Sequence, residues 1–193
     1  MSNKILVTGG TGFIGSHTVV ELYNAGYTPV IVDDLSNSSI KILDQIEKII
    51  GCKPEFHQFD LCDEAKTAAF IKSNPDIKGI IHFAAFKAVG ESVQKPLAYY
   101  RNNFFSLINL LSAYKEASIN FVFSSSCTVY GQPDSLPVTE SAPVKKAESP
   151  YGNTKQIAEE ILAETASVNK NYNIVALRYF NPVGAHETAL IGE

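Results

Sequence analysis

A glycine-rich turn near the N-terminus constrains the fold more than any other part of this sequence. An apolar run, Lys4–Thr8, leads into the turn, and a helical pattern, Phe13–Asn24, follows it. The Gly-x-Gly-x-x-Gly motif between them ends at Gly15 and fits the fingerprint of a dinucleotide-binding strand, turn and helix. Its glycines permit a sharp turn and a close approach of backbone N–H groups to a pyrophosphate. The helix dipole favours negative charge at that point.

An acidic residue follows at the spacing that this fingerprint requires. Asp33 comes directly after the apolar run Thr28–Val32, about twenty residues beyond the glycines. A carboxylate here accepts hydrogen bonds from the adenosine ribose and repels a 2′-phosphate. No Lys or Arg lies between Asp33 and Ile40 to bind such a phosphate, so we expect NAD and not NADP. The alternative is that Asp33 and Asp34 only cap a solvated loop.

Strand and helix patterns alternate along the chain. The expected strands are Lys4–Thr8, Thr28–Val32, Glu55–Phe59, Gly79–Phe83, Asn120–Ser124 and Asn173–Arg178. The expected helices are Phe13–Asn24, Ile40–Ile50, Glu64–Ser73, Leu97–Ala117 and Pro150–Val168. This alternation predicts an α/β fold with a doubly wound parallel sheet of the Rossmann type. Because several strands are almost continuously apolar, helices should cover both faces of the sheet.

Glycine and polar residues gather at the carboxyl ends of these expected strands. Ligands of doubly wound sheets bind at this edge. The coincidence predicts one shared site, built from Gly9–Gly15, Asp33, Asp60, Phe83–Lys87, Ser124–Ser126 and Tyr179–Asn181.

A Tyr-x-x-x-Lys motif opens the expected helix Pro150–Val168. Tyr151 and Lys155 are four residues apart and therefore share one face of the helix. A phenol is a poor base at neutral pH, but a nearby ammonium and an oxidised nicotinamide ring both favour its phenolate. Ser126, at the end of the preceding strand, is placed to hydrogen-bond the same substrate oxygen. The alternatives are a Tyr–Lys pair on the surface and a polar strand end capped by serines.

Bulk properties exclude several classes of protein. The 193 residues suffice for one substantial domain, and the net charge of −4 argues against nucleic-acid and membrane partners. Cys52, Cys62 and Cys127 lack metal-ligand spacing, so we expect no metal site and free, buried thiols. We see no signal peptide and no apolar run that could span a bilayer, and we expect a cytoplasmic location.

Together these motifs resemble the extended branch of the short-chain dehydrogenase/reductase superfamily. Within it, four further stretches are similar to the UDP-glucose 4-epimerase family: Ile81–Leu97, Tyr99–Asn103, Phe123–Gly131 and Leu177–His186. The resemblance extends from Lys4 to Glu193. It implies an isomerase of galactose metabolism that interconverts UDP-glucose and UDP-galactose with NAD, through a 4-keto sugar. The implied partner is the nucleotide-sugar substrate, and a homodimer is the assembly to test.

The resemblance also implies a role for individual residues. Tyr151, Lys155 and Ser126 would be catalytic, and Ser126, Tyr151 and Asn181 would contact the substrate. A larger set would form the NAD site: Gly9, Gly12, Phe13, Ile14, Gly15, Asp33, Asp34, Leu35, Ser36, Asn37, Ser38, Asp60, Leu61, Phe83, Ala84, Ala85, Phe86, Lys87, Asn102, Ser126, Tyr151, Lys155 and Phe180.

The sequence departs from the family pattern in two informative places. The superfamily's 4,6-dehydratases carry an Asp-Glu pair after the catalytic hydroxyl, whereas Cys127 and Thr128 follow Ser126 here, which disfavours a dehydratase. Family epimerases also continue beyond the position of Glu193, with a C-terminal domain that grips the nucleotide-sugar.

We therefore expect an NAD-binding domain over residues 1–180, the start of a substrate-binding region over residues 181–193, and impaired turnover if the protein ends there. Two other functions stay open: an NAD-binding module without turnover, and a related enzyme with net hydride transfer.

Overall fold

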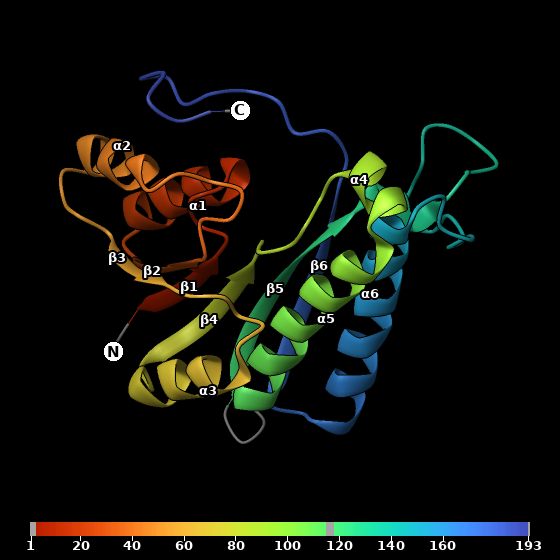
Figure 1. Cartoon of the computed structure of the whole chain (residues 1–193), viewed down its shortest axis with the longest axis horizontal. Helices are drawn as coiled ribbons and strands as arrows, with labels where there is room; N and C mark the ends of the chain where they lie inside the picture. The colour runs from red at the N-terminus through yellow and green to blue at the C-terminus, as the bar shows by residue number, and fades with distance from the viewer. Residues whose placement is uncertain (1–2, 115–117, 193) are drawn as a thin grey trace.

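Six parallel strands form one sheet at the centre of the molecule, with helices packed against it (Figure 1). The computed structural model describes residues 3–114 and 118–192. The strands are β1 (Lys4–Thr8), β2 (Thr28–Asp33), β3 (Glu55–Gln58), β4 (Ile77–His82), β5 (Ile119–Ser126) and β6 (Tyr172–Tyr179). The helices are α1 (Phe13–Asn24), α2 (Lys41–Ile50), α3 (Glu64–Ser73), α4 (Val89–Gln94), α5 (Pro96–Ala113) and α6 (Pro150–Val168). The strand order β3-β2-β1-β4-β5-β6 confirms the predicted doubly wound fold.

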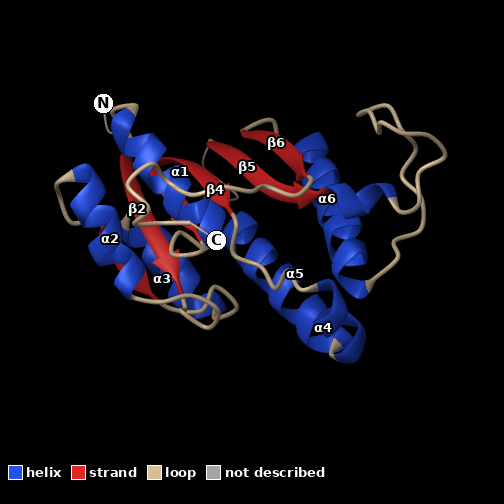
Figure 2. Ribbon diagram, turned by 90° about the horizontal axis from the view of Figure 1, so that it is seen from above, coloured by secondary structure: helices blue, strands red, loops and turns tan. Residues whose placement is uncertain are grey.

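Alternation along the central strands divides the core between the two faces of the sheet. In β1, Leu6 packs into one apolar cluster with residues of α3, α5 and α6, while Val7 packs into a second cluster with residues of α1 and α2. Both side chains are fully buried. Figures 1 and 2 show the corresponding helices on opposite faces of the sheet. Successive side chains of a strand point to opposite faces, so an almost continuously apolar strand fits here.

The edge strand β6 departs from the expectation that helices cover both faces. Val175 and Leu177 lie on the face opposite α6, and their exposed fractions are 54% and 40%. Farther along, the chain crosses the carboxyl edge of the sheet toward α1 and α2 (Figure 2). There Ile191 is buried in the apolar cluster of these two helices.

Both ends of β1, α1, α3 and α6 agree with the prediction, and almost all other boundaries differ from it by no more than two residues. The largest difference is the helix expected over Leu97–Ala117: α5 begins at Pro96 and ends at Ala113, and residues 115–117 lie outside the described residues. The short helix α4 and a 3₁₀ turn, Cys127–Tyr130, were not predicted. A helix of six residues that contains Gly90 has too short a pattern to detect.

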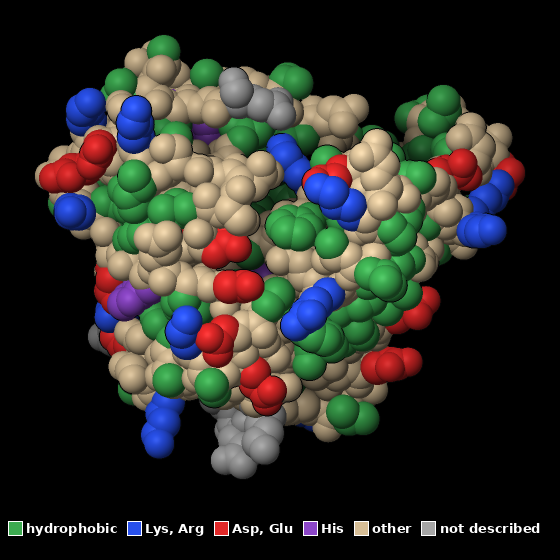
Figure 3. Space-filling view, viewed as in Figure 1, with side chains coloured by type: hydrophobic (Ala, Val, Ile, Leu, Met, Phe, Trp, Pro, Cys, Tyr) green, Lys and Arg blue, Asp and Glu red, His purple; other side chains and the backbone are tan. Residues whose placement is uncertain are grey.

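The exposure of the three thiols differs from the expectation drawn from the sequence. Cys52 is exposed, and Cys62 and Cys127 are partly buried, so the prediction that all three thiols are buried is wrong. Across the described residues, no helix is both long and apolar enough to cross a membrane. Acidic and basic side chains are interspersed on the face shown in Figure 3.

Candidate active site

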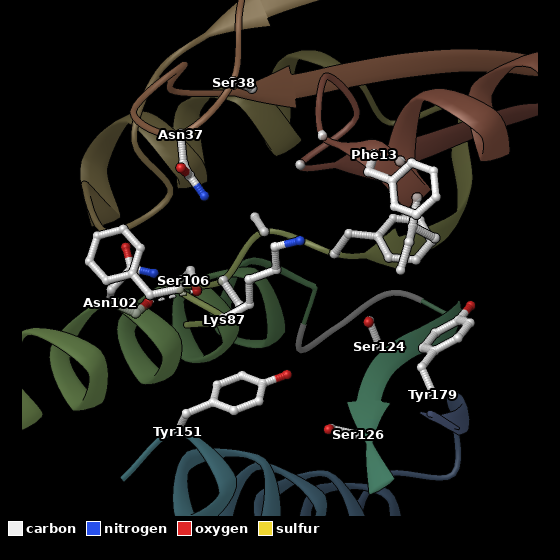
Figure 4. Close-up of a pocket in the computed structure, with 18 of the residues that line it drawn as sticks. Phe13, Asn37, Ser38, Lys87, Asn102, Ser106, Ser124, Ser126, Tyr151 and Tyr179 are labelled. Atoms are coloured by element: carbon white, nitrogen blue, oxygen red, sulfur yellow. Dashed lines mark hydrogen bonds between the residues drawn. The ribbon is translucent and has the colours of Figure 1, made fainter. Parts of the chain in front are cut away.

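A cleft of about 830 Å³ lies along the carboxyl edge of the sheet. The glycine turn forms one end and α6 forms the other, and Figure 4 shows Tyr151 and Ser126 on the side opposite Phe13 and Ser38. The residues predicted for the cofactor and the substrate all line this cleft, except Leu35. Leu35 instead turns the loop after β2, with a φ of +63°, and donates its N–H to the Asp33 carboxylate at 2.9 Å.

The glycine turn leaves open space in front of the first turn of α1. A Cβ at Gly15 would lie 2.2 Å from the Gly9 carbonyl oxygen, so this contact between turn and helix requires glycine. A Cβ at Gly12 would meet only the Gly9 carbonyl oxygen within 4 Å, at 3.3 Å. Gly12 is also the N-cap residue and has no side chain to accept from the N–H groups of the first turn. This leaves an anion-sized cradle bordered by Phe13 and Ile14.

Asp33 joins the loop after β2 to the glycine turn. Its carboxylate accepts from the Thr11 N–H at 3.2 Å, the Leu35 N–H at 2.9 Å and the Ser38 hydroxyl at 3.1 Å. The Thr11 and Ser38 hydroxyls also hydrogen-bond each other at 2.7 Å. Asp33 therefore caps its own loop, as the alternative interpretation held, and also lines the cleft. These bonds fix the position of the carboxylate.

Tyr151 lies in the first turn of α6, where its surroundings favour the neutral phenol. Burial raises the pKa of the phenol, and the polar Ser126 side chain lowers it by less. The Lys155 Nζ lies 5.9 Å from the centroid of the Tyr151 ring, and the expectation that its charge favours the phenolate stays a prediction. Without a further positive charge in the cleft, burial dominates and the phenol keeps its proton.

The Lys155 ammonium is hydrogen-bonded to the end of β5. Its Nζ donates to the Ser124 carbonyl at 2.7 Å and lies 4.7 Å from the centroid of the Phe123 ring. The side chain is almost fully buried, and burial lowers the pKa of Lys155 to about 8 although the negative charge of Glu159 opposes this. Lys155 thus carries a positive charge at neutral pH and links α6 to β5.

Ser126 ends β5 with its hydroxyl in the cleft. The Thr128 N–H and hydroxyl donate to the Ser126 Oγ at 3.2 Å and 3.0 Å, which fixes the oxygen at the start of the 3₁₀ turn. Asn181 follows β6 at the same edge and also lines the cleft. The three residues expected to contact the substrate, Ser126, Tyr151 and Asn181, therefore share one end of it.

Asn103 is a structural residue of the site that the sequence interpretation missed. Its side-chain oxygen accepts from the Phe86 N–H at 2.8 Å, and its amide nitrogen donates to the Phe86 carbonyl at 3.1 Å and to the Thr154 hydroxyl at 3.0 Å. It thereby holds the loop after β4 against α5 and α6. The only signal in the sequence was a polar residue beside Asn102 within a helical pattern.

The cleft also has lining residues outside the set predicted to bind the cofactor and the substrate. Three of them, Ser124, Ser125 and Tyr179, lie in the strand-end stretches that were predicted to build the shared site. Ser106 lies one helical turn beyond Asn102 and therefore on the same face of α5, so the helical spacing could have predicted it. The full set of additional residues is Val32, Phe59, Val89, Ser106, Ser124, Ser125, Cys127, Thr128, Tyr179, Pro182 and Val183.

Comparison with known proteins gives relatives for nearly the whole chain. It is 50% identical over 190 residues to the UDP-glucose 4-epimerase of Haemophilus influenzae and 49% identical over 196 residues to that of Dictyostelium discoideum. These alignments cover 98% and 100% of this chain but 56% of each relative. The chain thus spans little more than half the length of these relatives.

Two solved structures are similar to this chain over almost its whole length. The UDP-glucose 4-epimerase from Bifidobacterium longum, in complex with NAD⁺ and UDP, has a TM-score of 0.95 and 46% identity, over 98% of this chain and 57% of that one. The enzyme from Stenotrophomonas maltophila, with bound NAD and formylated UDP-arabinopyranose, has a TM-score of 0.93 and 47% identity, over 98% of this chain and 56% of that one. Residues 5–191 also match the model of one protein family. The chain belongs to the NAD dependent epimerase/dehydratase family.

Proposed function

We propose that this chain carries the NAD site and the proton-transfer residues of an enzyme that interconverts UDP-glucose and UDP-galactose. The observation that carries the proposal is a single cleft with an anion cradle at one end and Tyr151, Ser126 and Lys155 at the other. The relatives named UDP-glucose 4-epimerase supply the choice of reaction and of sugar.

The residues present fit NAD. The space before Gly12 suits the pyrophosphate, and the fixed Asp33 carboxylate suits the adenosine ribose hydroxyls. The loop Phe83–Lys87 and Phe180 line the cleft between these groups and Tyr151. When bound, NAD supplies a hydride acceptor that returns the hydride to the sugar, so there is no net redox change.

Tyr151 and Ser126 are placed for proton transfer at one substrate oxygen. The Tyr151 phenolate takes the proton of the sugar 4-hydroxyl, and Ser126 hydrogen-bonds the same oxygen. Loss of this proton together with the C4 hydride, for which NAD would be the acceptor, would give the 4-keto sugar. The sugar would then turn in the cleft, and Tyr151 would return the proton when the hydride comes back to the opposite face. Lys155 adds positive charge below the strand end, and Asn181 contacts the nucleotide-sugar.

Product analysis tests this proposal. The purified chain, and a version extended by the C-terminal part of the Haemophilus influenzae relative, are given UDP-galactose and NAD. UDP-glucose without accumulation of NADH supports the proposal. Accumulation of NADH indicates net hydride transfer instead, and bound NAD without any product from either protein indicates a binding module.

The assembly and location form the remaining part of the proposal. Three apolar side chains share the outer face of α5, where Leu97, Phe105 and Ile108 are 81%, 46% and 41% exposed. A band of hydrophobic side chains crosses this region in Figure 3. We propose that a second copy of the chain covers this face, which light scattering of the purified protein tests. The free cysteines suit a reducing, cytoplasmic location.

A further inference from the structure

The carboxylate of Glu159 lies one helical turn beyond Lys155, on the face of α6 that also carries Tyr151. It accepts from the Ser125 hydroxyl at 2.5 Å and from Arg178 at two points, Nε at 3.0 Å and Nη2 at 2.7 Å. The Glu159 side chain is 18% exposed and that of Arg178 is 25% exposed. A bidentate, charge-assisted pair in this setting fixes both side chains.

Three consecutive residues of β5, Ser124–Ser126, meet three residues of α6. The carbonyl of the first accepts from Lys155, the hydroxyl of the second donates to Glu159, and the third lies at the same end of the cleft as Tyr151 (Figure 4). In the middle contact, Ser125 lines the cleft and Glu159 does not. This contact lies between the two positions that define the proton-transfer end of the cleft, so it sets how the strand end meets the helix.

Arg178 extends the same network to β6. It pairs with Ser125 in the register of the sheet and lies two residues before Phe180 and three before Asn181. Its guanidinium also lies 4.7 Å from the centroid of the buried Tyr130 ring. The ion pair of Glu159 and Arg178 therefore joins α6 to β6, and the hydrogen bond from Ser125 to Glu159 adds β5 to the same network.

The charge of Glu159 also faces Lys155. Tyr151 approaches Lys155 from α6, Phe123 and the Ser124 carbonyl approach it from β5, and His82 interacts with it from β4. His82 is neutral at working pH because burial lowers its pKa to about 3. Glu159 supplies the negative charge that opposes the effect of burial on the Lys155 pKa.

We propose that Glu159 is a positioning residue: clamped by Arg178, its carboxylate holds the Ser124–Ser126 strand end and the Lys155 ammonium in the arrangement that Tyr151 needs. This inference rests on the proposed function, because it assigns Glu159 to the support of that proton transfer. It assigns no contact between Glu159 and the substrate.

Glu159→Gln, which keeps the shape and removes the charge, tests the electrostatic effect of Glu159 on Lys155 without any turnover. Lysine ¹³Cε resonances are titrated by NMR; Lys155 titrates near pH 8, apart from ordinary lysines near roughly 10.4, and Lys155→Arg identifies its signal. The Lys155 midpoint should fall by roughly 0.5–1 pH unit. The exposed neighbour Glu160 provides the matched control, since Glu160→Gln removes the same charge and should leave the midpoint in place. An unchanged midpoint in Glu159→Gln overturns the inference.

Turnover tests the positioning itself. In Glu159→Gln, kcat should fall roughly tenfold or more with KM unchanged, and the alkaline limb of the kcat profile should move to lower pH with the Lys155 midpoint. Ser125→Ala removes one hydrogen bond and leaves the ion pair, so it should lower kcat without moving that midpoint; it also serves if Glu159→Gln does not fold. Wild-type kcat in Ser125→Ala, or an equal effect of Glu160→Gln, overturns the inference. Absence of epimerase turnover in both the wild-type chain and its extended version contradicts the proposed function, while the titration still decides the role of Glu159.

Discussion

At the scale of single residues, the end of the cleft beside α6 contains two ionisable groups, Tyr151 and Lys155, and burial disfavours the charged form of each. Burial raises the pKa of Tyr151, which opposes the phenolate, and lowers that of Lys155, which opposes the ammonium. The phenolate and the ammonium favour each other, and the phenolate alone gains further from a positive ring in the cleft. We therefore expect the phenol to keep its proton without the cofactor, and oxidised NAD to favour the phenolate when it binds.

Tyr151→Phe tests the proton-transfer role, since it keeps the ring and removes the phenol. Turnover should fall by roughly a hundred- to ten-thousand-fold, the usual contribution of acid–base catalysis. The acidic limb of the kcat profile should also disappear, because that limb reports loss of the phenolate as pH falls. Steady-state kinetics across pH provides the measurement, and calorimetry should show that NAD still binds. Near-normal turnover would mean that another group moves the proton.

His82 gives the stability of the fold a pH dependence. It is buried, hydrogen-bonded to the Thr8 hydroxyl at 2.8 Å, and its pKa is lowered from 6.5 to about 3. Between these values the unfolded chain binds more protons than the folded one. The free energy of unfolding is therefore unaffected by His82 above about pH 6.5 and falls below it, by up to about 1.4 kcal/mol per pH unit.

His82→Asn tests this assignment, because the amide can replace the bond to Thr8 and does not titrate. Urea unfolding from pH 8 to pH 4 should show a constant difference between variant and wild type above pH 7. Below about pH 6.5 the wild type should lose stability more steeply than the variant. Parallel curves over the whole range would contradict the assignment.

At the scale of elements, the sequence predicted the sheet and its edge but not all of the support behind it. Periodicity and the glycine turn predicted six strands and the helices α1, α2, α3, α5 and α6, because long patterns and tight turns are local signals. The ion pair of Glu159 and Arg178 was not predictable, because it joins two elements whose contact depends on tertiary packing. Asn103 was missed for the same reason: its partners, Phe86 and Thr154, are 17 and 51 residues away.

Asn103→Ala tests the junction of the loop after β4 with α5 and α6. The substitution leaves two backbone groups of Phe86 and the Thr154 hydroxyl without this partner, which costs roughly 1–3 kcal/mol of unfolding free energy for each group that stays dry. Denaturant unfolding should show this loss. NAD affinity should fall as well, because the loop lines the cleft. Asn24→Ala, at an exposed asparagine at the end of α1, is the control and should change stability by less than about 0.5 kcal/mol. Equal stabilities for the two variants would contradict the role of Asn103.

At the scale of the whole molecule, the cleft divides the sheet between two groups of elements. On one side, the glycine turn connects β1 to α1, and Asp33 ends β2. On the other side, Ser126 ends β5, Tyr151 lies in the first turn of α6, and Phe180 follows β6. A dinucleotide that spans this edge contacts both groups at once. Its binding energy therefore adds to the stability of the whole fold and is not confined to one loop.

NAD should therefore raise the melting temperature of this chain, and NADP should do so much less. A ligand at one hundred times its Kd adds about 2.7 kcal/mol to the unfolding free energy, which for a domain of this size corresponds to a rise of roughly 5–10 °C. At the same concentration NADP should give a smaller shift, because Asp33 is fixed by Thr11 and Ser38 and repels a 2′-phosphate. Differential scanning calorimetry with both cofactors provides the measurement, and Asp33→Asn, which removes the charge and keeps the shape, should narrow the difference between them. Equal shifts for NAD and NADP in the wild type would show that Asp33 does not select the cofactor, and no shift with either would show that the cleft does not bind a dinucleotide.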